Sequence, residues 1–231
     1  MLGAVHAAGA AFAGSLQVDP VRIDLSASEK TAAITLRNGG DEPIVVQIDA
    51  LAWAQELGND VYTPTQGLFV TPPIVTIPAG GEQLVRTALR SAPDASRESA
   101  FRIYFQEVPP PPKPGFRGLQ VALRIGIPVF VQPAAGAAAP RPQWSAVRTG
   151  AGQIRLSVAN EGNGHLKVGA LALFAPGAEP ALATEGLAYV LPGQRREWLI
   201  PVAAGAAPAR VRLNASTNAG DLDTELPVGA P

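Results

Sequence analysis

The chain of 231 residues is long enough for one large domain or for two domains of about 100 residues, and either can bury its own core. Its 18 basic and 19 acidic residues give a formal net charge of −1, which argues against a broad nucleic-acid surface because such a surface needs clustered cations. The chain has no cysteine, which excludes disulfides, thiol nucleophiles and cysteine-ligated zinc, and no uninterrupted apolar stretch reaches the roughly 18 residues of a transmembrane helix.

Residues 1–13 are apolar and small, and Ala11-Phe12-Ala13 has the pattern of a small-x-small cleavage site. We therefore expect a signal peptide at residues 1–13 and Gly14 as the first residue of the exported chain. The basic segment that normally opens such a peptide is missing, which fits a leader whose start lies further upstream. A flexible apolar N-terminus is the alternative.

Glycine and proline, 24 and 23 residues respectively, interrupt the chain at the short intervals typical of an all-β sandwich. Between them, runs of alternating apolar and polar residues predict strands, and few windows show the 3.6-residue apolar repeat of a helix. The predicted strands lie at residues 33–36, 44–48, 84–89, 101–105, 119–131, 154–158, 166–173 and 211–215.

A segment of small residues and prolines at 133–142 predicts an extended linker. It divides the chain into an N-terminal domain at 14–132 and a C-terminal domain at 143–231, each of a size suited to an immunoglobulin-like sandwich. The prolines of residues 109–115 cannot join a β-ladder, so we expect a loop there.

The run from Leu119 to Val131 is the most informative of the predicted strands. One of its faces is an unbroken aliphatic row of Leu119, Val121, Leu123, Ile125, Ile127 and Val129. Pro128 favours a position at a sheet edge, because a central strand would lose a ladder hydrogen bond there. A long aliphatic edge strand is suited to β-augmentation, in which a partner adds its own strand. The alternative is a long core strand that turns a corner near Pro128.

Several blocks of the sequence resemble, in order and spacing, the periplasmic pilus-assembly chaperones. They are Val21-Arg22-Ile23-Asp24, Thr71-Pro72-Pro73, residues 77–86, residues 97–109 with the proline-rich loop and residues 119–133 after them, and more loosely residues 160–165 and Leu191-Pro192-Gly193. The resemblance implies two immunoglobulin-like domains at an angle with a cleft between them. It also implies a non-enzymatic chaperone, without cofactor, in the periplasm of a Gram-negative bacterium.

The same resemblance implies that the 119–129 face is donated to an unfinished pilin subunit, which is then delivered to an outer-membrane usher. Arg22 matches the family's cleft arginine, which anchors the carboxylate at the subunit's C-terminus. Pro128 stands where family members with the best-known pattern carry a second anchor, a lysine, so Arg102 or Arg124 is expected to supply that charge. This departure, with residues 124–130, looks more like the branch described as archaic.

Glu98 matches a family position in an interdomain charge network, but the aligned arginine partner is Gln132, so we expect that network to be incomplete. Free chaperone is expected to hide its edge strand in a self-dimer. Two other functions stay open: a β-sandwich component or adhesin of the fibre itself, and a carbohydrate-active sandwich, for which no clear carboxylate pair is present.

Little in the sequence points to catalysis or metal binding. His165 lies in a Gly-Asn-Gly-His turn and is interpreted as a solvated loop residue, and no GxSxG motif accompanies it. Asp221, Asp223 and Glu225 alternate along a predicted strand and are interpreted as a solvated face rather than a calcium site.

Overall fold

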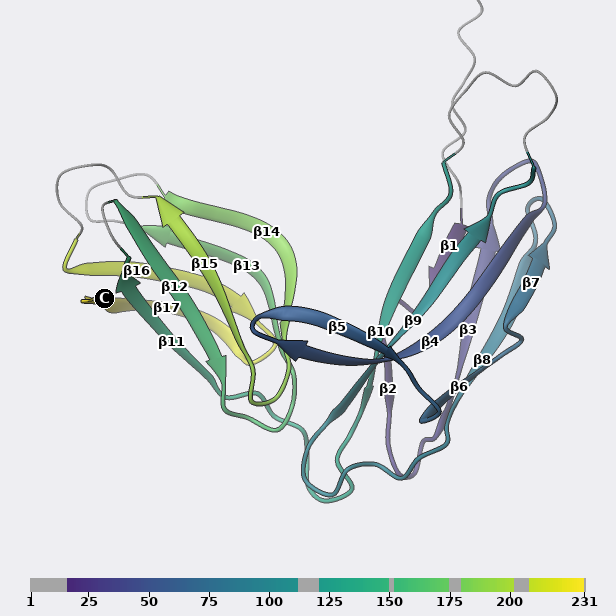
Figure 1. The fold of residues 1–231 in the computed structure, drawn as a ribbon, viewed down its shortest axis with the longest axis horizontal. Coiled ribbons are helices and arrows are strands. Elements are labelled where there is room, and N and C mark those ends of the chain that lie inside the picture. Colours follow the sequence, from purple (N-terminus) through teal and green to yellow (C-terminus); the bar gives the residue numbers. More distant parts are fainter. Residues whose placement is uncertain (1–15, 112–120, 150–151, 175–179, 202–207, 231) are drawn as a thin grey trace, which may run out of the picture.

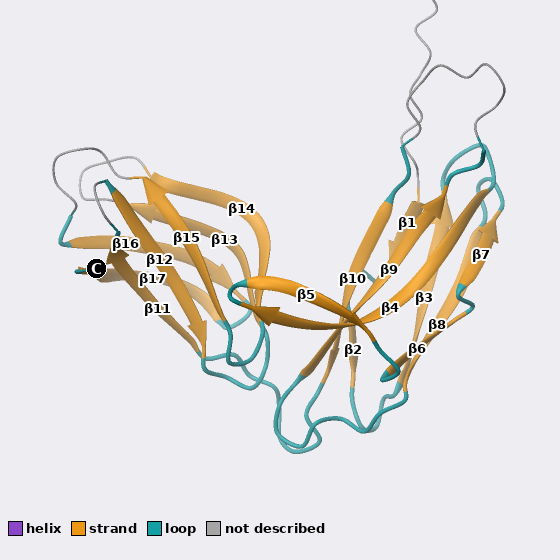
Figure 2. Cartoon of the chain, viewed as in Figure 1, coloured by secondary structure: helices purple, strands orange, loops and turns teal. Residues whose placement is uncertain are grey.

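The structure, a computed structural model, describes residues 16–111, 121–149, 152–174, 180–201 and 208–230, with only the backbone described for residues 180–187. These residues form seventeen strands and no helix (Figure 2), which confirms the all-β prediction. In the same ranges, then, there is no helix of the length and apolarity needed to cross a membrane.

The first ten strands build a two-sheet sandwich. One sheet has the order β1 (Leu16–Asp19), β3 (Thr31–Asn38), β8 (Glu82–Leu89), β6 (Leu68–Thr71). The other has the order β2 (Ile23–Leu25), β10 (Arg124–Val131), β9 (Ser99–Val108), β4 (Ile44–Glu56), β5 (Asn59–Pro64), with β7 (Ile74–Ile77) also paired to β4.

The remaining strands form one seven-stranded sheet that folds over a second core. Its order is β14 (Pro180–Val190), β13 (Leu166–Phe174), β16 (Arg210–Thr217), β17 (Gly220–Gly229), β11 (Pro142–Arg148), β12 (Gln153–Asn160), β15 (Arg195–Pro201). Figure 1 shows the two β-sandwiches set at an angle, with the long β4–β5 hairpin reaching from the first towards the second. The described residues between Val131 and Pro142 form no strand, and the domain boundary at 133–142 stays a prediction.

Alternation along the strands explains both cores. On β9, Phe101, Ile103 and Phe105 are buried against the opposite sheet, while the residues between them point to the other face of their own sheet. Ile154, Leu156 and Val158 of β12 do the same in the second core. Each domain therefore has its own hydrophobic centre, as an independent sandwich requires.

Seven of the eight predicted strands fall within observed ones, whereas the strand observed in the run at 119–131 is shorter than predicted. The strand β10 begins at Arg124, and Val121 to Leu123 precede it without strand pairing. A single backbone bond, from the N–H of Glu107 to the carbonyl of Leu123 (2.9 Å), continues the contact with β9 there. Leu119 lies outside the described residues.

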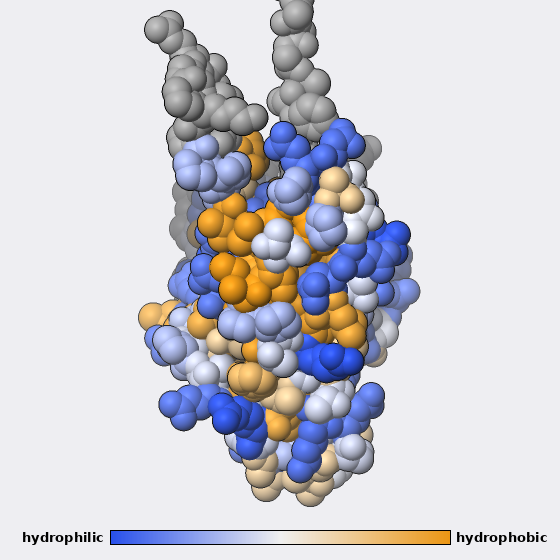
Figure 3. All heavy atoms as spheres, turned by 90° about the vertical axis from the view of Figure 1, so that its right-hand side faces the viewer, coloured by the Kyte–Doolittle hydropathy of each residue, from blue (hydrophilic) through white to orange (hydrophobic). Residues whose placement is uncertain are grey.

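The outward side of the first domain is shown in Figure 3, where apolar side chains gather at the centre of a polar surround. The large exposed apolar residues of the strands on this side are Phe69 on β6, Ile74 on β7 and Leu84 on β8. Leu84 belongs to a different sheet from β10, so a substitution at Leu84 can serve as a control for substitutions made along β10.

The linker packs closely against the loop after β12. A Cβ added to Gly162 would lie 2.2 Å from the carbonyl oxygen of Ala139 and 2.6 Å from the backbone nitrogen of Arg141. The side chain of Asn160 stabilises this loop from inside by donating to the carbonyls of Gly164 (2.8 Å) and Val190 (2.9 Å). The absence of a side chain at Gly162 is therefore a requirement of the linker's path.

We expect Gly162→Ala to lower the free energy of unfolding by about 1–3 kcal/mol, because the added methyl group forces the backbone of the linker to move. Gly169→Ala is the matched control, since the nearest atom to its new Cβ would be 3.8 Å away. Urea unfolding of both variants measures the effect. Equal losses in the two variants would contradict the role of the linker contact.

Candidate functional site

The site is built on the face of β9 and β10 that points away from the core. The two strands are antiparallel, and their register pairs Arg124 with Gln106, Gly126 with Tyr104, and Pro128 with Arg102. Because side chains alternate between faces, these six residues share the outward face, while Ile127 and Val129 share the core face with Ile103 and Phe101.

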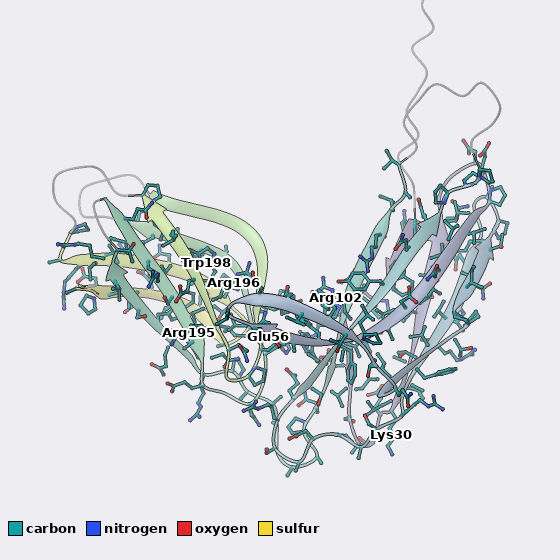
Figure 4. All side chains as sticks on the ribbon, viewed as in Figure 1. Lys30, Glu56, Arg102, Arg195, Arg196 and Trp198 are labelled. Carbon is teal, nitrogen blue, oxygen red and sulfur yellow. The ribbon has the colours of Figure 1, made fainter. Side chains whose placement is uncertain are left out.

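Two arginines flank Pro128 on this face. On one side, Arg102 is its register partner across β9. On the other side, β2 runs parallel to β10 with Ile23 beside Val129, which places Arg22 next to Pro128. Figure 4 shows Arg102 where β4, β9 and β10 come together between the domains. The position that carries no charge in the sequence is thus bordered by a guanidinium on each side.

The two guanidinium groups differ in how they are held. Arg22 is bound to Asp24, with Nε 2.9 Å from Oδ2 and Nη2 2.8 Å from Oδ1, and it lies over the Phe130 ring at 5.7 Å. Arg102 lies over the Trp53 ring at 5.2 Å, and its Nε is buried without a hydrogen-bond partner among the described residues. Unlike Arg22, Arg102 makes no ion pair with an acidic side chain in the described part of the chain, and such a cation is suited to bind an anion.

Arg124 lies further along the same face and stacks on Tyr104, with its guanidinium 4.0 Å from the ring centroid. Gly126 makes room for this arrangement, because a Cβ there would lie 2.7 Å from Cε1 of Tyr104 and 3.1 Å from Nε of Arg102. Arg124 is two residues from Gly126 and four from Pro128, so about 13 Å of strand separates it from the level of the two arginines.

At the C-terminal end of β10, this face meets a group of mainly aromatic side chains at the junction of the domains. Trp53, Phe130, Tyr189 and Leu191 form a buried cluster to which both domains contribute. Gln55 ties the cluster together, since its Nε2 donates to the Tyr189 carbonyl (2.9 Å) and its Oε1 accepts from the Leu191 N–H (2.9 Å). Both polar atoms of the Gln55 side-chain amide are therefore paired across the junction.

A second polar contact crosses the junction and corrects the interpretation of His165. This side chain is not solvated: it is 6% exposed, and its Nδ1 lies 2.7 Å from Oε2 of Glu98, which is 2% exposed. The His165 backbone N–H donates to the same oxygen at 2.7 Å. Glu98 therefore does have an interdomain partner, supplied by His165, while Gln132 accepts from the linker N–H of Ala138 (3.0 Å).

The predicted donor row divides into two parts. Val121 is 57% exposed, and Leu123 and Ile125 are partly buried against the first core. Ile127 and Val129 are 2% and 0% exposed and belong to that core, so in this chain their side chains are not presented to a partner. The edge of β10 opposite β9 has no paired strand among the described residues before Val129, because β2 pairs with β10 only from Val129 to Val131. The part of this edge before Val129 is called the free edge, and it lies above β2 in Figure 1.

The β4–β5 hairpin ends against the second domain. A hollow of about 490 Å³ is lined there by Leu57, Gly58 and Asn59 of the turn and by Arg195, Arg196 and Glu197 of β15. In Figure 4, Glu56 at the end of the hairpin lies beside Arg195 and Arg196. Leu57 at its tip is 98% exposed, so the apolar side chain at the tip is not buried against the second domain.

The acidic strand near the C-terminus forms surface ion pairs. Asp223 binds Arg212, Glu225 binds Arg210 at 3.0 Å, and Asp221 accepts from Ser216 at 2.9 Å. All of these lie on an exposed face, as the sequence predicted. In the described ranges, no group of three or more His, Asp or Glu side chains is arranged to hold a metal ion.

Known proteins resemble this chain in sequence and in fold. Residues 15–137, more than half of the chain, match the family model described as pili and flagellar-assembly chaperone, PapD N-terminal domain. The chain is 32% identical over 136 residues to the chaperone protein PapD of Escherichia coli, covering 56% of this chain and 54% of PapD. The match thus spans about half the length of that curated relative.

Solved structures share the fold over nearly the whole chain. One is a chain of the CsuC–CsuE chaperone–tip adhesion subunit pre-assembly complex from archaic chaperone–usher Csu pili of Acinetobacter baumannii, with a TM-score of 0.68, 21% identity and coverage of 94% of this chain and 99% of that one. Another is a chain of the Salmonella enterica SafA pilin in complex with the SafB chaperone, with a TM-score of 0.64, 19% identity and coverage of 94% and 97%. At these identities the likeness confirms the fold of two immunoglobulin-like domains.

The aromatic face predicts a pH dependence of stability. Burial raises the pKa of Tyr62, against the opposing effect of the nearby Arg102, and burial also raises the pKa of Tyr189. An acid whose pKa is higher in the folded chain stabilises that state below the unfolded value of about 10, and the contribution is lost as the pH rises above it.

We therefore expect the free energy of unfolding to fall from about pH 10 upwards, and to fall less in Tyr62→Phe. Urea unfolding between pH 8 and 11 measures this. Ultraviolet titration of the three tyrosines gives the control, because all of them should ionise near pH 10 once the chain is unfolded. A slope unchanged by Tyr62→Phe would contradict the assignment.

Proposed function

The chain belongs to the pili and flagellar-assembly chaperone family, and we propose that it binds unfinished pilin subunits in the periplasm of a Gram-negative bacterium by donor-strand complementation. In this proposal it then delivers them to an outer-membrane usher. The observation that carries the proposal is the free upper edge of β10, which has partly exposed aliphatic side chains and ends beside two arginines.

The free edge supplies both parts of a strand-addition site. Its backbone above Val129 has β9 on one side and no paired strand on the other among the described residues, so a partner strand can complete the ladder. Val121, Leu123 and Ile125 are the side chains available to an apolar groove in the subunit. Full burial is worth about 1.5–3 kcal/mol for each before the cost of ordering, which is enough to matter in a stable complex.

The two arginines at the end of this edge are suited to anchor a terminal carboxylate. The guanidinium of Arg22 is held in place by Asp24, and Arg102 has a buried Nε with no partner in the described part of the chain. In our proposal Arg102 replaces the charge that Pro128 lacks, since the two residues are register partners. Because Arg124 lies about 13 Å further along the strand, our proposal assigns the second charge to Arg102 rather than to Arg124. The archaic branch stays a prediction.

We expect Leu123→Glu to abolish subunit binding, because it places a charge where the donated face must be buried. The test is a pull-down of the tagged chain from a periplasmic extract of its source bacterium, with mass spectrometry of the small proteins that copurify. Leu84→Glu is the matched control, since Leu84 is exposed on the outward sheet of the same domain. Retention of the subunit by Leu123→Glu, or its equal loss from both variants, would contradict the donor-strand assignment.

We also expect Arg22→Gln and Arg102→Gln each to weaken binding of the purified subunit by about tenfold or more, the usual range for a lost charge-assisted hydrogen bond to a carboxylate. Arg86→Gln, which removes an exposed arginine from the outward sheet, should leave the affinity unchanged. Calorimetric titration measures all three. Unaltered affinity in Arg102→Gln would mean that Arg22 acts without a second cation.

A further inference from the structure

Four side chains form a continuous column from the interior of the domain junction to the proposed carboxylate site. Glu98 binds His165 at 2.7 Å, the His165 ring stacks on Phe130 with centroids 3.6 Å apart and planes 6° apart, and the guanidinium of Arg22 lies over Phe130 at 5.7 Å. His165 comes from the second domain and the other three from the first. The column thus links the contact between the domains to one of the two anchoring arginines.

The hydrogen bonds of His165 fix the plane of its ring. Oε2 of Glu98 accepts the backbone N–H of His165 at 2.7 Å and also lies 2.7 Å from Nδ1 of the ring, so both the backbone and the ring of His165 are held by the same oxygen. The Nε2 atom is buried and has no hydrogen-bond partner among the described residues. Among the described residues, the ring is therefore held by hydrogen bonding through Nδ1 alone.

The Phe130 ring has little freedom to turn independently of His165. It is 0% exposed, and its remaining aromatic neighbours are Trp53 at 5.9 Å and Tyr189 at 5.7 Å. A change in the plane of the histidine must therefore be taken up by Phe130, on which the Arg22 guanidinium rests. The charged and titratable groups around the column are Glu98, Tyr189, Asp24 and Arg102.

We propose that His165 is a positioning residue for Arg22, acting through Phe130, so that binding of a carboxylate at the cleft and closure of the domain junction are energetically coupled. The proposal rests on the proposed carboxylate site at Arg22 and Arg102. The second domain contributes no residue to the free edge of β10, but through His165 it would take part in binding the terminal carboxylate of the subunit. By reciprocity, a ligand on Arg22 must also alter the environment of His165.

The imidazole of His165 allows a direct test by NMR. The chain has two histidines, so a His6→Gln variant leaves a single imidazole to observe. Sodium propionate, a simple alkyl carboxylate, is titrated into this protein while the imidazole and the arginine Nε–H signals are recorded. We expect the His165 signals to follow the same saturation curve as those of Arg22, and propionamide to move neither.

Two variants separate coupling from general loss of structure. Arg22→Gln should abolish the response of His165, whereas Arg37→Gln, which removes an arginine paired with Glu82 on the outward sheet, should preserve it. His165→Asn retains a donor for Glu98 but loses the ring stack on Phe130. We expect it to weaken propionate binding by about two- to fivefold, because the contact of Arg22 with Phe130 that it disturbs has the strength of an exposed cation–π contact. If His165→Asn does not fold, the titration of the His6→Gln protein still shows whether the His165 and Arg22 signals respond together to propionate.

The outcomes distinguish this proposal from the one on which it rests. If Arg22 and Arg102 respond to propionate while His165 does not, the coupling is wrong and the anchor stands. If neither arginine responds, the anchor fails and the coupling fails with it. A parallel response of Arg22 and His165 that disappears in Arg22→Gln supports the coupling.

Discussion

A strand presents its side chains to two faces, and in β9 and β10 both faces have a use. Ile103, Phe105 and Val129 fill the first core, so the residues between them are directed to the side that faces the second domain. Packing of the core thus determines where Arg102, Tyr104 and Arg124 stand, without any interaction dedicated to placing them. The proposed site inherits its rigidity from the hydrophobic core behind it.

The second domain is held against that face by polar contacts buried among aromatic rings. Gln55 and Glu98 each place a side-chain oxygen where it accepts hydrogen bonds from the opposite domain. Removing either side chain would leave buried donors without acceptors, so these contacts specify one arrangement of the domains more than an apolar interface would. These contacts lie at the junction of the two domains, which are set at an angle in Figure 1.

The sequence was a good guide to the strands that bury one face, because alternation is a local signal. It missed β1, β2, β5, β6, β7, β11, β14 and β15, most of which are short or exposed and are strands because their neighbours pair with them. The row at 119–129 predicted an edge strand, but the length of edge that stays unpaired depends on where β2 begins, beside Val129, which no local pattern contains.

The surroundings of the charged residues and of His165 likewise depend on contacts between parts of the chain that are far apart in sequence. Arg22 was singled out by its resemblance to a family motif, whereas the placement of Arg102 beside Pro128 depends on the register of two strands far apart in sequence. His165 was misinterpreted because its glycine-rich turn has the composition of a solvated loop. Only the packing of one domain on the other buries it, and a composition-based reading of the turn cannot detect that.

The short strand β2 gives the free edge of β10 a closed end. It occupies the hydrogen-bonding positions from Val129 onwards, so a strand added above it can slide no further than Pro128. A slip of one residue would turn every side chain of the added strand to the opposite face, and a physical stop prevents such slips more reliably than apolar contacts alone. If the edge takes up a strand as proposed, the position of β2 would therefore fix the register of that strand from its end and would favour partners whose apolar pattern is in phase with it.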